Sequence, residues 1–203
     1  MLSSMRKCLI VLSTLLLIPC AALAQDPPPY TYVGVGYIAS DADFSDGNFD
    51  DILDIDDEGD GFFVDGSFGG KMWHVFAEYA QGSFGSDLDQ TRWFVGGGWH
   101  GALGERGDIV ADLAYVENEI ELPFDNYKDD GYRARAGVRY RLIKLLELNG
   151  FVNYTDLSDA GSETSYEVNA VAYVWRVGLG LGYESFDDVD EITAYARFVF
   201  GKN

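Results

Sequence analysis

An alternation of apolar and polar residues runs through most of the chain, and this period of two is the pattern of β strands. No segment of any length carries the helical period. Ten segments show the alternation, which predicts an all-β protein. The predicted strands are about 30–39, 60–69, 72–82, 90–100, 107–118, 131–142, 146–155, 165–174, 176–185 and 190–200.

The eighth and ninth of these strands are not separated by a Gly or Asn turn signal. Read as one strand, 166–183 would extend roughly 60 Å at about 3.3 Å per residue, whereas a strand that crosses a bilayer needs only about 9–11 residues. The apolar residues also change parity, from even positions such as Val168 to odd positions such as Leu179. Both facts predict a tight turn at Trp175-Arg176 and ten strands in total, with eight strands as the alternative.

The predicted connections alternate between long and short. Loops are expected at about 40–59, 83–89, 119–130, 156–164 and 186–189, and tight turns at Gly70-Lys71, 101–106, 143–145 and Trp175-Arg176. The loop end is acidic, because residues 41–60 contain ten Asp or Glu and no Lys or Arg. An even strand number with loops at one end and turns at the other is the anatomy of bacterial outer-membrane barrels.

Alternation alone also fits a soluble, lipocalin-like barrel with its apolar face inward. Three observations favour the inverted arrangement of a membrane barrel. The polar face carries sparse charges of both signs, which suits a confined interior where a charge needs a partner. That face is also rich in glycine, for example at Gly34 and Gly180, and the other face carries aromatic residues near strand ends.

Four arginines share one parity in the segment GYRARAGVRYR (131–141) of this acidic chain. We expect them to point into the lumen, with Asp112 and Glu147 on the flanking strands as partners, because a guanidinium pairs with a carboxylate through two parallel hydrogen bonds. The predicted lumen ion-pair network consists of Arg92, Arg133, Arg135, Arg139, Arg141, Arg197, Asp65, Glu78, Asp112, Glu147 and Glu167.

The first 24 residues have the pattern of a secretory signal. Arg6 and Lys7 precede an apolar core at 9–18, and Ala22-Leu23-Ala24 supplies small residues for cleavage before Gln25. The prediction is therefore a cleaved signal peptide at 1–24 and one barrel domain at 25–203, with a lipoprotein acylated at Cys20 as the alternative. Both cysteines leave with the signal, and the net charge changes from −20 to −22. Such a charge disfavours nucleic acid as a partner.

The segments YVGVGY (32–37), WHVFAEY (73–79), AGVRY (136–140), LGLGYE (179–184) and AYARFVF (194–200) resemble the small OmpA/OmpX-like outer-membrane β-barrel superfamily. The resemblance covers about 30–200. It implies a location in the outer membrane of a Gram-negative bacterium, with extracellular loops and with the turns and both termini in the periplasm. It also implies outer-membrane lipid, lipopolysaccharide and the assembly machinery as partners. That machinery reads a C-terminal aromatic residue, and this chain departs by placing Gly201-Lys202-Asn203 after Phe200.

The sequence offers only weak candidates for catalytic or metal-binding residues. The histidines, His74 and His100, lie near the predicted turns rather than at the outer rim where barrel enzymes place catalytic groups, so no catalytic residues are assigned. The stretch 54–65 partly imitates a calcium loop, with Asp54, Asp56 and Glu58 at ligand positions, but it lacks flanking helices. We expect no cofactor beyond loose divalent cation binding at the acidic loops.

The sequence therefore predicts a non-enzymatic, porin-like barrel of the cell envelope. Its expected role is to support envelope integrity or to interact with an extracellular or host surface ligand through its acidic loops. The alternative is a narrow channel for ions or very small solutes, since wide diffusion channels need 16–18 strands. A lipid-modifying barrel enzyme is the third class.

Overall fold

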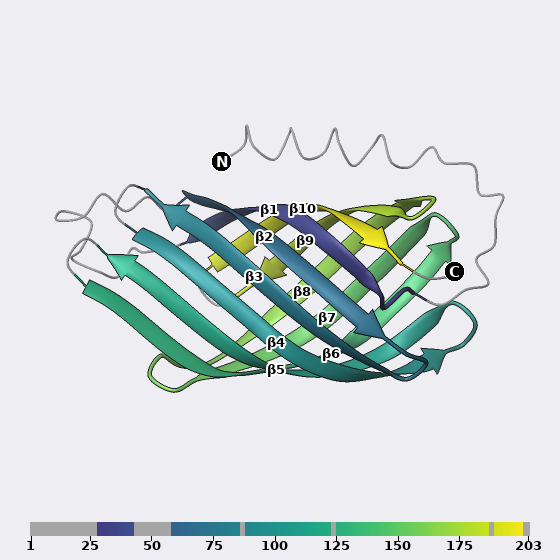
Figure 1. The fold of residues 1–203 in the computed structure, drawn as a ribbon, viewed down its shortest axis with the longest axis horizontal. Coiled ribbons are helices and arrows are strands. Elements are labelled where there is room, and N and C mark those ends of the chain that lie inside the picture. Colours follow the sequence, from purple (N-terminus) through teal and green to yellow (C-terminus); the bar gives the residue numbers. More distant parts are fainter. Residues whose placement is uncertain (1–27, 43–57, 86–87, 123–124, 187–188, 201–203) are drawn as a thin grey trace.

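The computed structural model describes residues 28–42, 58–85, 88–122, 125–186 and 189–200. These residues form ten antiparallel strands that close into one barrel (Figure 1). The strands are β1 (Tyr32–Ala42), β2 (Glu58–Gly69), β3 (Trp73–Phe84), β4 (Leu88–Leu103), β5 (Gly107–Leu122), β6 (Asp125–Ile143), β7 (Leu146–Leu157), β8 (Gly161–Val174), β9 (Val177–Ser185) and β10 (Val189–Val199). The predicted number of ten strands is confirmed.

Each strand pairs with its neighbours in sequence, and β1 closes the barrel against β10 from Tyr32–Val199 to Ala42–Val189. Closure leaves no unpaired sheet edge around the barrel wall, which removes the usual site of edge-to-edge association. Among the described residues there is no helix of the length and apolarity needed to cross a bilayer.

The turn between β8 and β9 lies where the change of parity predicts it. β8 ends at Val174, β9 begins at Val177, and these two residues face each other across the hairpin. Trp175 adopts a positive φ of 57°, in the left-handed region that tight hairpin turns require. A two-residue turn of this kind therefore forms here without a glycine or an asparagine.

The predicted loops at 119–130 and 156–164 were wrong in extent. β5 continues to Leu122 and β6 begins at Asp125, so paired strands occupy most of the first segment. β8 already begins at Gly161, which leaves only a short turn after β7. The strands continue because the two-residue alternation of inward and outward side chains continues. On β5, glutamates hold the outward positions toward the loop end, and apolar residues hold them toward the turn end.

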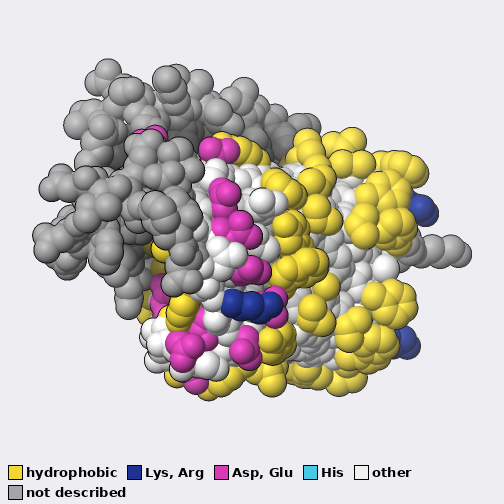
Figure 2. All heavy atoms as spheres, turned by 60° about the vertical axis from the view of Figure 1, so that its left-hand side comes forward, with side chains coloured by type: hydrophobic (Ala, Val, Ile, Leu, Met, Phe, Trp, Pro, Cys, Tyr) yellow, Lys and Arg dark blue, Asp and Glu magenta, His cyan; other side chains and the backbone are white. Residues whose placement is uncertain are grey.

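The outer face of the barrel is apolar, as shown by valine and leucine side chains such as Val35 and Leu113 that are 55% and 60% exposed. Toward the loop end, the apolar part of the outer face ends on every strand with one large residue. This residue is aromatic on each strand except β10, where it is an isoleucine. These residues are Tyr37, Phe62, Tyr79, Trp93, Tyr115, Tyr132, Tyr154, Tyr166, Tyr183 and Ile192. Figure 2 shows the hydrophobic band and the Asp and Glu side chains that border it. An apolar band ended by aromatic residues is the lipid-facing surface of a transmembrane β-barrel.

Candidate functional site

The candidate site is the barrel interior, which is lined by the inward residues of all ten strands and crossed by polar side chains. Nearest the loop end, Arg92 of β4 reaches Glu191 of β10. Its Nη1 and Nη2 donate to Oε1 and Oε2 at 3.3 and 3.1 Å. This forked pair joins two strands that are not neighbours in the sheet, so it spans the lumen.

One step further inside, Arg133 of β6 lies 2.6 Å from Oε1 of Glu184 on β9. The same oxygen accepts hydrogen bonds from Asn153 at 2.9 Å and from Ser165 at 2.5 Å. Glu167 is a second, more distant partner of Arg133, at 4.0 Å. Glu184 thus gathers donors from β6, β7 and β8 and ties them to β9.

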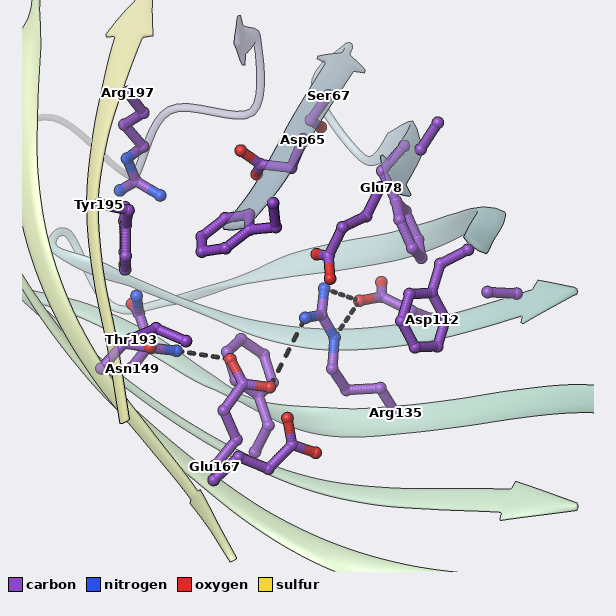
Figure 3. A pocket seen from close by; sticks show the side chains of 18 of the residues that line it. Asp65, Ser67, Glu78, Asp112, Arg135, Asn149, Glu167, Thr193, Tyr195 and Arg197 are labelled. Carbon is purple, nitrogen blue, oxygen red and sulfur yellow. Dashed lines mark hydrogen bonds and ion pairs between the residues drawn. The ribbon is translucent and has the colours of Figure 1, made fainter. Parts of the chain in front are cut away.

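Near the middle of the lumen, Asp112 of β5 is bonded through one carboxylate oxygen to Arg135 of β6 (Figure 3). Nε and Nη2 of Arg135 lie 2.8 and 2.7 Å from Oδ2, and Nε2 of His74 lies 3.0 Å from Oδ1. The Arg135 guanidinium also lies 4.5 Å from the ring centre of Phe151. The arginine is therefore fixed by a carboxylate and an aromatic face together.

A glycine on the neighbouring strand makes room for this carboxylate. A Cβ atom at Gly98 would lie 1.9 Å from Oδ1 of Asp112. Any side chain at that position would displace the carboxylate from His74, so the inward glycine of β4 is required by the ion pair beside it.

Toward the turn end, the carboxylate of Glu147 of β7 is fully buried and accepts hydrogen bonds on both of its oxygens. Its Oε1 lies 2.7 Å from Nη2 of Arg139 and 3.0 Å from Nη2 of Arg197. Its Oε2 accepts a hydrogen bond from the Tyr173 hydroxyl at 2.9 Å. Arg141, one inward position below Arg139, lies 5.0 Å from the centre of the Tyr173 ring.

The segment before β1 closes the turn end of the lumen. Tyr30 is only 8% exposed, and its ring stacks on that of His100 at 3.6 Å. The ring of His74, on the neighbouring strand β3, lies 5.0 Å from that of Tyr30. Arg139 donates from Nη2 to the carbonyl oxygen of Pro29 at 3.0 Å. The two histidines thus pack around a tyrosine near the turns.

The structure places each residue of the predicted network on the inward face. It brings Arg135 to Asp112 and both Arg139 and Arg197 to Glu147. It also uses two carboxylates that sequence reasoning missed, Glu184 and Glu191. Asp65 and Glu78 line the central cavity of about 180 Å³ and belong to no ion pair within 4.0 Å among the described residues.

Other predicted features lie partly outside the described residues. The signal sequence at 1–24 lies outside them, as do Asp54 and Asp56 of the imitated calcium loop, while Glu58 is the first residue of β2. Within the described part of the chain, no three His, Cys, Asp or Glu side chains come together as a metal-binding group.

Beyond the aromatic residues at the loop end, Asp129 of β6 fastens the turn between β7 and β8. Its carboxylate accepts hydrogen bonds from the backbone N–H groups of Asp159, at 3.1 Å, and Ala160, at 2.8 Å. Desolvation raises the pKa of the Asp129 carboxyl, but these N–H donors and that of Asp130 outweigh it and hold the pKa below its usual value.

No family model matches the sequence, and no curated protein matches it. Solved barrel structures are similar in architecture. The KdgM porin is 9% identical, with a TM-score of 0.43, over 83% of this chain and 99% of that chain. Ail, the attachment invasion locus protein of Yersinia pestis, is 14% identical, with a TM-score of 0.38, over 84% and 97%. Neisserial surface protein A is 11% identical, with a TM-score of 0.40, over 83% and 96%. These low sequence identities and TM-scores describe a likeness in barrel architecture alone and carry no information about function.

Proposed function

We propose that this chain is a non-enzymatic outer-membrane barrel of the small OmpA/OmpX-like type, which stabilises the envelope and presents an acidic surface to the outside. The observation that carries the proposal is the set of ion pairs that cross the lumen. Arg92–Glu191 spans it near the loop end, and the cluster of Arg139, Glu147 and Arg197 spans it near the turn end. A barrel closed at both levels does not serve as a general diffusion pore.

Energetics support a closed lumen. Removing one partner of a buried ion pair typically costs about 3–5 kcal/mol, because the other charge is left without compensation. An open channel would have to break such pairs at two levels and also move Tyr30 away from His100. The closed arrangement is therefore expected to dominate at equilibrium.

The second candidate is a narrow channel for ions or very small solutes. The central cavity and its polar lining of both signs favour it. A brief opening of the two cross-lumen pairs would join this cavity to both sides of the membrane.

Conductance of the purified barrel in a planar bilayer separates the two candidates. The proposal predicts no steady current from wild-type protein. It also predicts a clear current from the double variant Arg92→Ala/Glu147→Ala, whose cross-lumen pairs are lost. Steady current from most wild-type barrels would contradict the proposal and favour the channel.

The envelope role needs a test in cells. A strain that lacks the chain should admit more of a hydrophobic dye, and wild-type protein should restore exclusion. The closed-lumen reading predicts that Arg135→Ala restores it as well, provided that the variant folds. Mass spectra of lipid A that change with the presence of the chain would instead support the enzyme class.

A further inference from the structure

The turn end of the barrel carries one cation on each of its turns. These turns join β2 to β3, β4 to β5, β6 to β7 and β8 to β9. Their cations, called the turn-end cations below, are Lys71, Arg106, Lys144 and Arg176. Every other lysine or arginine in the described residues points into the lumen, except Lys128, which lies at the loop end. Positive charge outside the lumen is therefore concentrated at the turn end.

No carboxylate neutralises the turn-end cations. None of them lies within 4.0 Å of an Asp or Glu oxygen in the described part of the chain. Glu105 is the one exposed carboxylate on these turns, all of which the structure describes. At the loop end, by contrast, Lys128 is paired with Glu117 at 2.6 Å, and Glu119 is a further outward carboxylate beside them. Figure 2 shows the two ends, with Lys and Arg side chains at the right-hand edge, beyond the hydrophobic side chains, and Asp and Glu side chains toward the other end.

Each turn-end cation has a large, exposed apolar side chain near it, on the turn or at the adjoining strand end. These side chains are Met72, Leu103, Leu145 and Trp175. Trp175 is the most exposed of them, at 74%, and the guanidinium of Arg176 lies 5.4 Å from the centre of its ring. Lysine and arginine at a membrane interface bury their stems against apolar groups and extend the charge to the headgroups. The same pairing on every turn therefore indicates an interfacial position rather than open water.

Aromatic side chains set the depth of the turns. Trp73 of β3 and Trp99 of β4 face each other on the outer surface, next to the turns. The ring of Trp175 meets the edge of the Phe198 ring at 6.1 Å. Rings of this kind lie at the level of the headgroups in a bilayer. The turn-end cations lie close beyond these rings in the sequence, as Lys71 does beyond Trp73, and so reach the phosphates of the same leaflet.

We propose that the turn-end cations bind the headgroups of anionic phospholipids and select them over zwitterionic lipids in the surrounding leaflet. One lysine or arginine near an anionic lipid surface favours binding by about fivefold. A zwitterionic headgroup carries its own cation and offers no such gain. The inference rests on the membrane location in the proposed function and is independent of whether the lumen is closed.

Quenching of tryptophan fluorescence by brominated lipids tests this preference, because the tryptophans mark both ends. Trp73, Trp99 and Trp175 lie at the turn end, and Trp93 lies at the loop end. Trp93→Phe therefore reports on the turn end, and Trp73→Phe/Trp99→Phe/Trp175→Phe reports on the loop end. Each variant is refolded into vesicles of phosphatidylcholine and phosphatidylglycerol, in which one lipid carries bromine on its acyl chains. Both leaflets have the same composition, so the orientation of the barrel does not affect the result.

At the turn end, phosphatidylglycerol should associate at least about twofold more strongly than phosphatidylcholine, since only part of the lipid around each tryptophan contacts a cation. Trp93 should show no such preference, because the outward carboxylates at the loop end repel anionic lipid. Raising KCl from about 0.1 M to about 1 M shortens the Debye length from about 10 Å to about 3 Å and should weaken the turn-end preference. This readout needs no change to the turn-end cations.

Charge variants on the Trp93→Phe background assign the preference to particular residues. Lys71→Gln/Arg106→Gln/Lys144→Gln/Arg176→Gln should abolish it. The matched control, Lys128→Gln, removes the loop-end cation and should retain it. If the quadruple variant does not insert into vesicles, the single variant Arg176→Gln replaces it and should reduce the preference.

Equal quenching of the turn-end tryptophans by the two lipids would overturn this inference and leave the barrel in the membrane. A preference that survives loss of the turn-end cations would also overturn it. A preference that disappears when the barrels are diluted with lipid would overturn it in favour of a second copy of the chain. Absence of quenching by either lipid would overturn the membrane location as well, so the two failures are distinguishable, and bilayer conductance is independent of both.

Discussion

Arg135 contacts one oxygen of Asp112 with two nitrogens, Nε at 2.8 Å and Nη2 at 2.7 Å, while Nε2 of His74 lies 3.0 Å from the other oxygen. The Asp112 side chain is 1% exposed and that of Arg135 is 28% exposed, so the carboxylate is shielded from bulk solvent while the guanidinium is partly accessible to lumen water. Arg135→Ala is expected to lower the free energy of unfolding by roughly 1–3 kcal/mol. This is less than the usual cost of breaking a buried pair, because water in the lumen partly solvates the carboxylate that is left without its partner.

The exposed pair Lys128–Glu117 provides the control for this variant. Its nitrogen and oxygen are 2.6 Å apart, but the lysine side chain is 53% exposed. Lys128→Ala should change the free energy of unfolding by about 0–1 kcal/mol. Urea unfolding in lipid vesicles measures both variants, and an equal effect would show that the lumen pair is no better shielded than a surface pair.

Ala136 tests the assignment of the two faces. It is the next residue after Arg135, and it points outward in the middle of β6. Ala136→Arg should destabilise the barrel in vesicles by roughly 2–4 kcal/mol, because an arginine on the lipid face near the midplane is costly. Ala134→Arg, on the same face but closer to Tyr132, should cost less. Tolerance of both substitutions would show that this face does not meet lipid.

Asp129 gives a pH dependence. Its folded pKa is lowered, so its contribution to stability is complete above the ordinary carboxyl pKa of about 3.9 and is lost as the pH falls through the lower folded value. The amides of Asp159 and Ala160 should therefore stay protected from hydrogen exchange at pH 5 and lose protection only in stronger acid. Asp129→Ala should remove this protection at neutral pH, whereas Glu119→Ala should not. Protection that survives Asp129→Ala would mean that another contact holds the turn.

Lysine labelling tests the orientation of the barrel. Lys128 lies at the loop end, and Lys71 and Lys144 are exposed at the turn end. An amine reagent that cannot cross the outer membrane should modify Lys128 on intact cells and spare the other two. All three should react after the membrane is broken. The reverse pattern would place the turns outside.

The strands could be predicted almost completely from the sequence, because the period of two persists wherever one face is apolar. Even the turn at Trp175 could be found, since a two-residue turn between paired strands changes the parity of the outward positions. The upper parts of β5 and β6 were missed because their outward positions carry residues such as Glu119 and Lys128 instead of apolar ones. Hydrogen bonding between the strands continues there without an apolar face.

The interior was harder to predict than the wall. Neighbouring strands suggest partners such as Asp112 for Arg135, since inward residues on adjacent strands lie close together. Arg92–Glu191 and Arg133–Glu184 cross the lumen between strands that are far apart around the sheet, and alternation carries no information on such distances. The stacking of Tyr30 on His100 was missed for the same reason, because it precedes the first strand.

The location of the folded chain in the cell tests the central claim most directly. Membranes of a Gram-negative strain that expresses the full chain should be separated by density and run on gels with and without boiling. The chain should appear in the outer-membrane fraction and should migrate differently before and after boiling, as a closed barrel does. Recovery as a soluble periplasmic protein with heat-independent mobility would contradict the claim and support a lipocalin-like barrel instead.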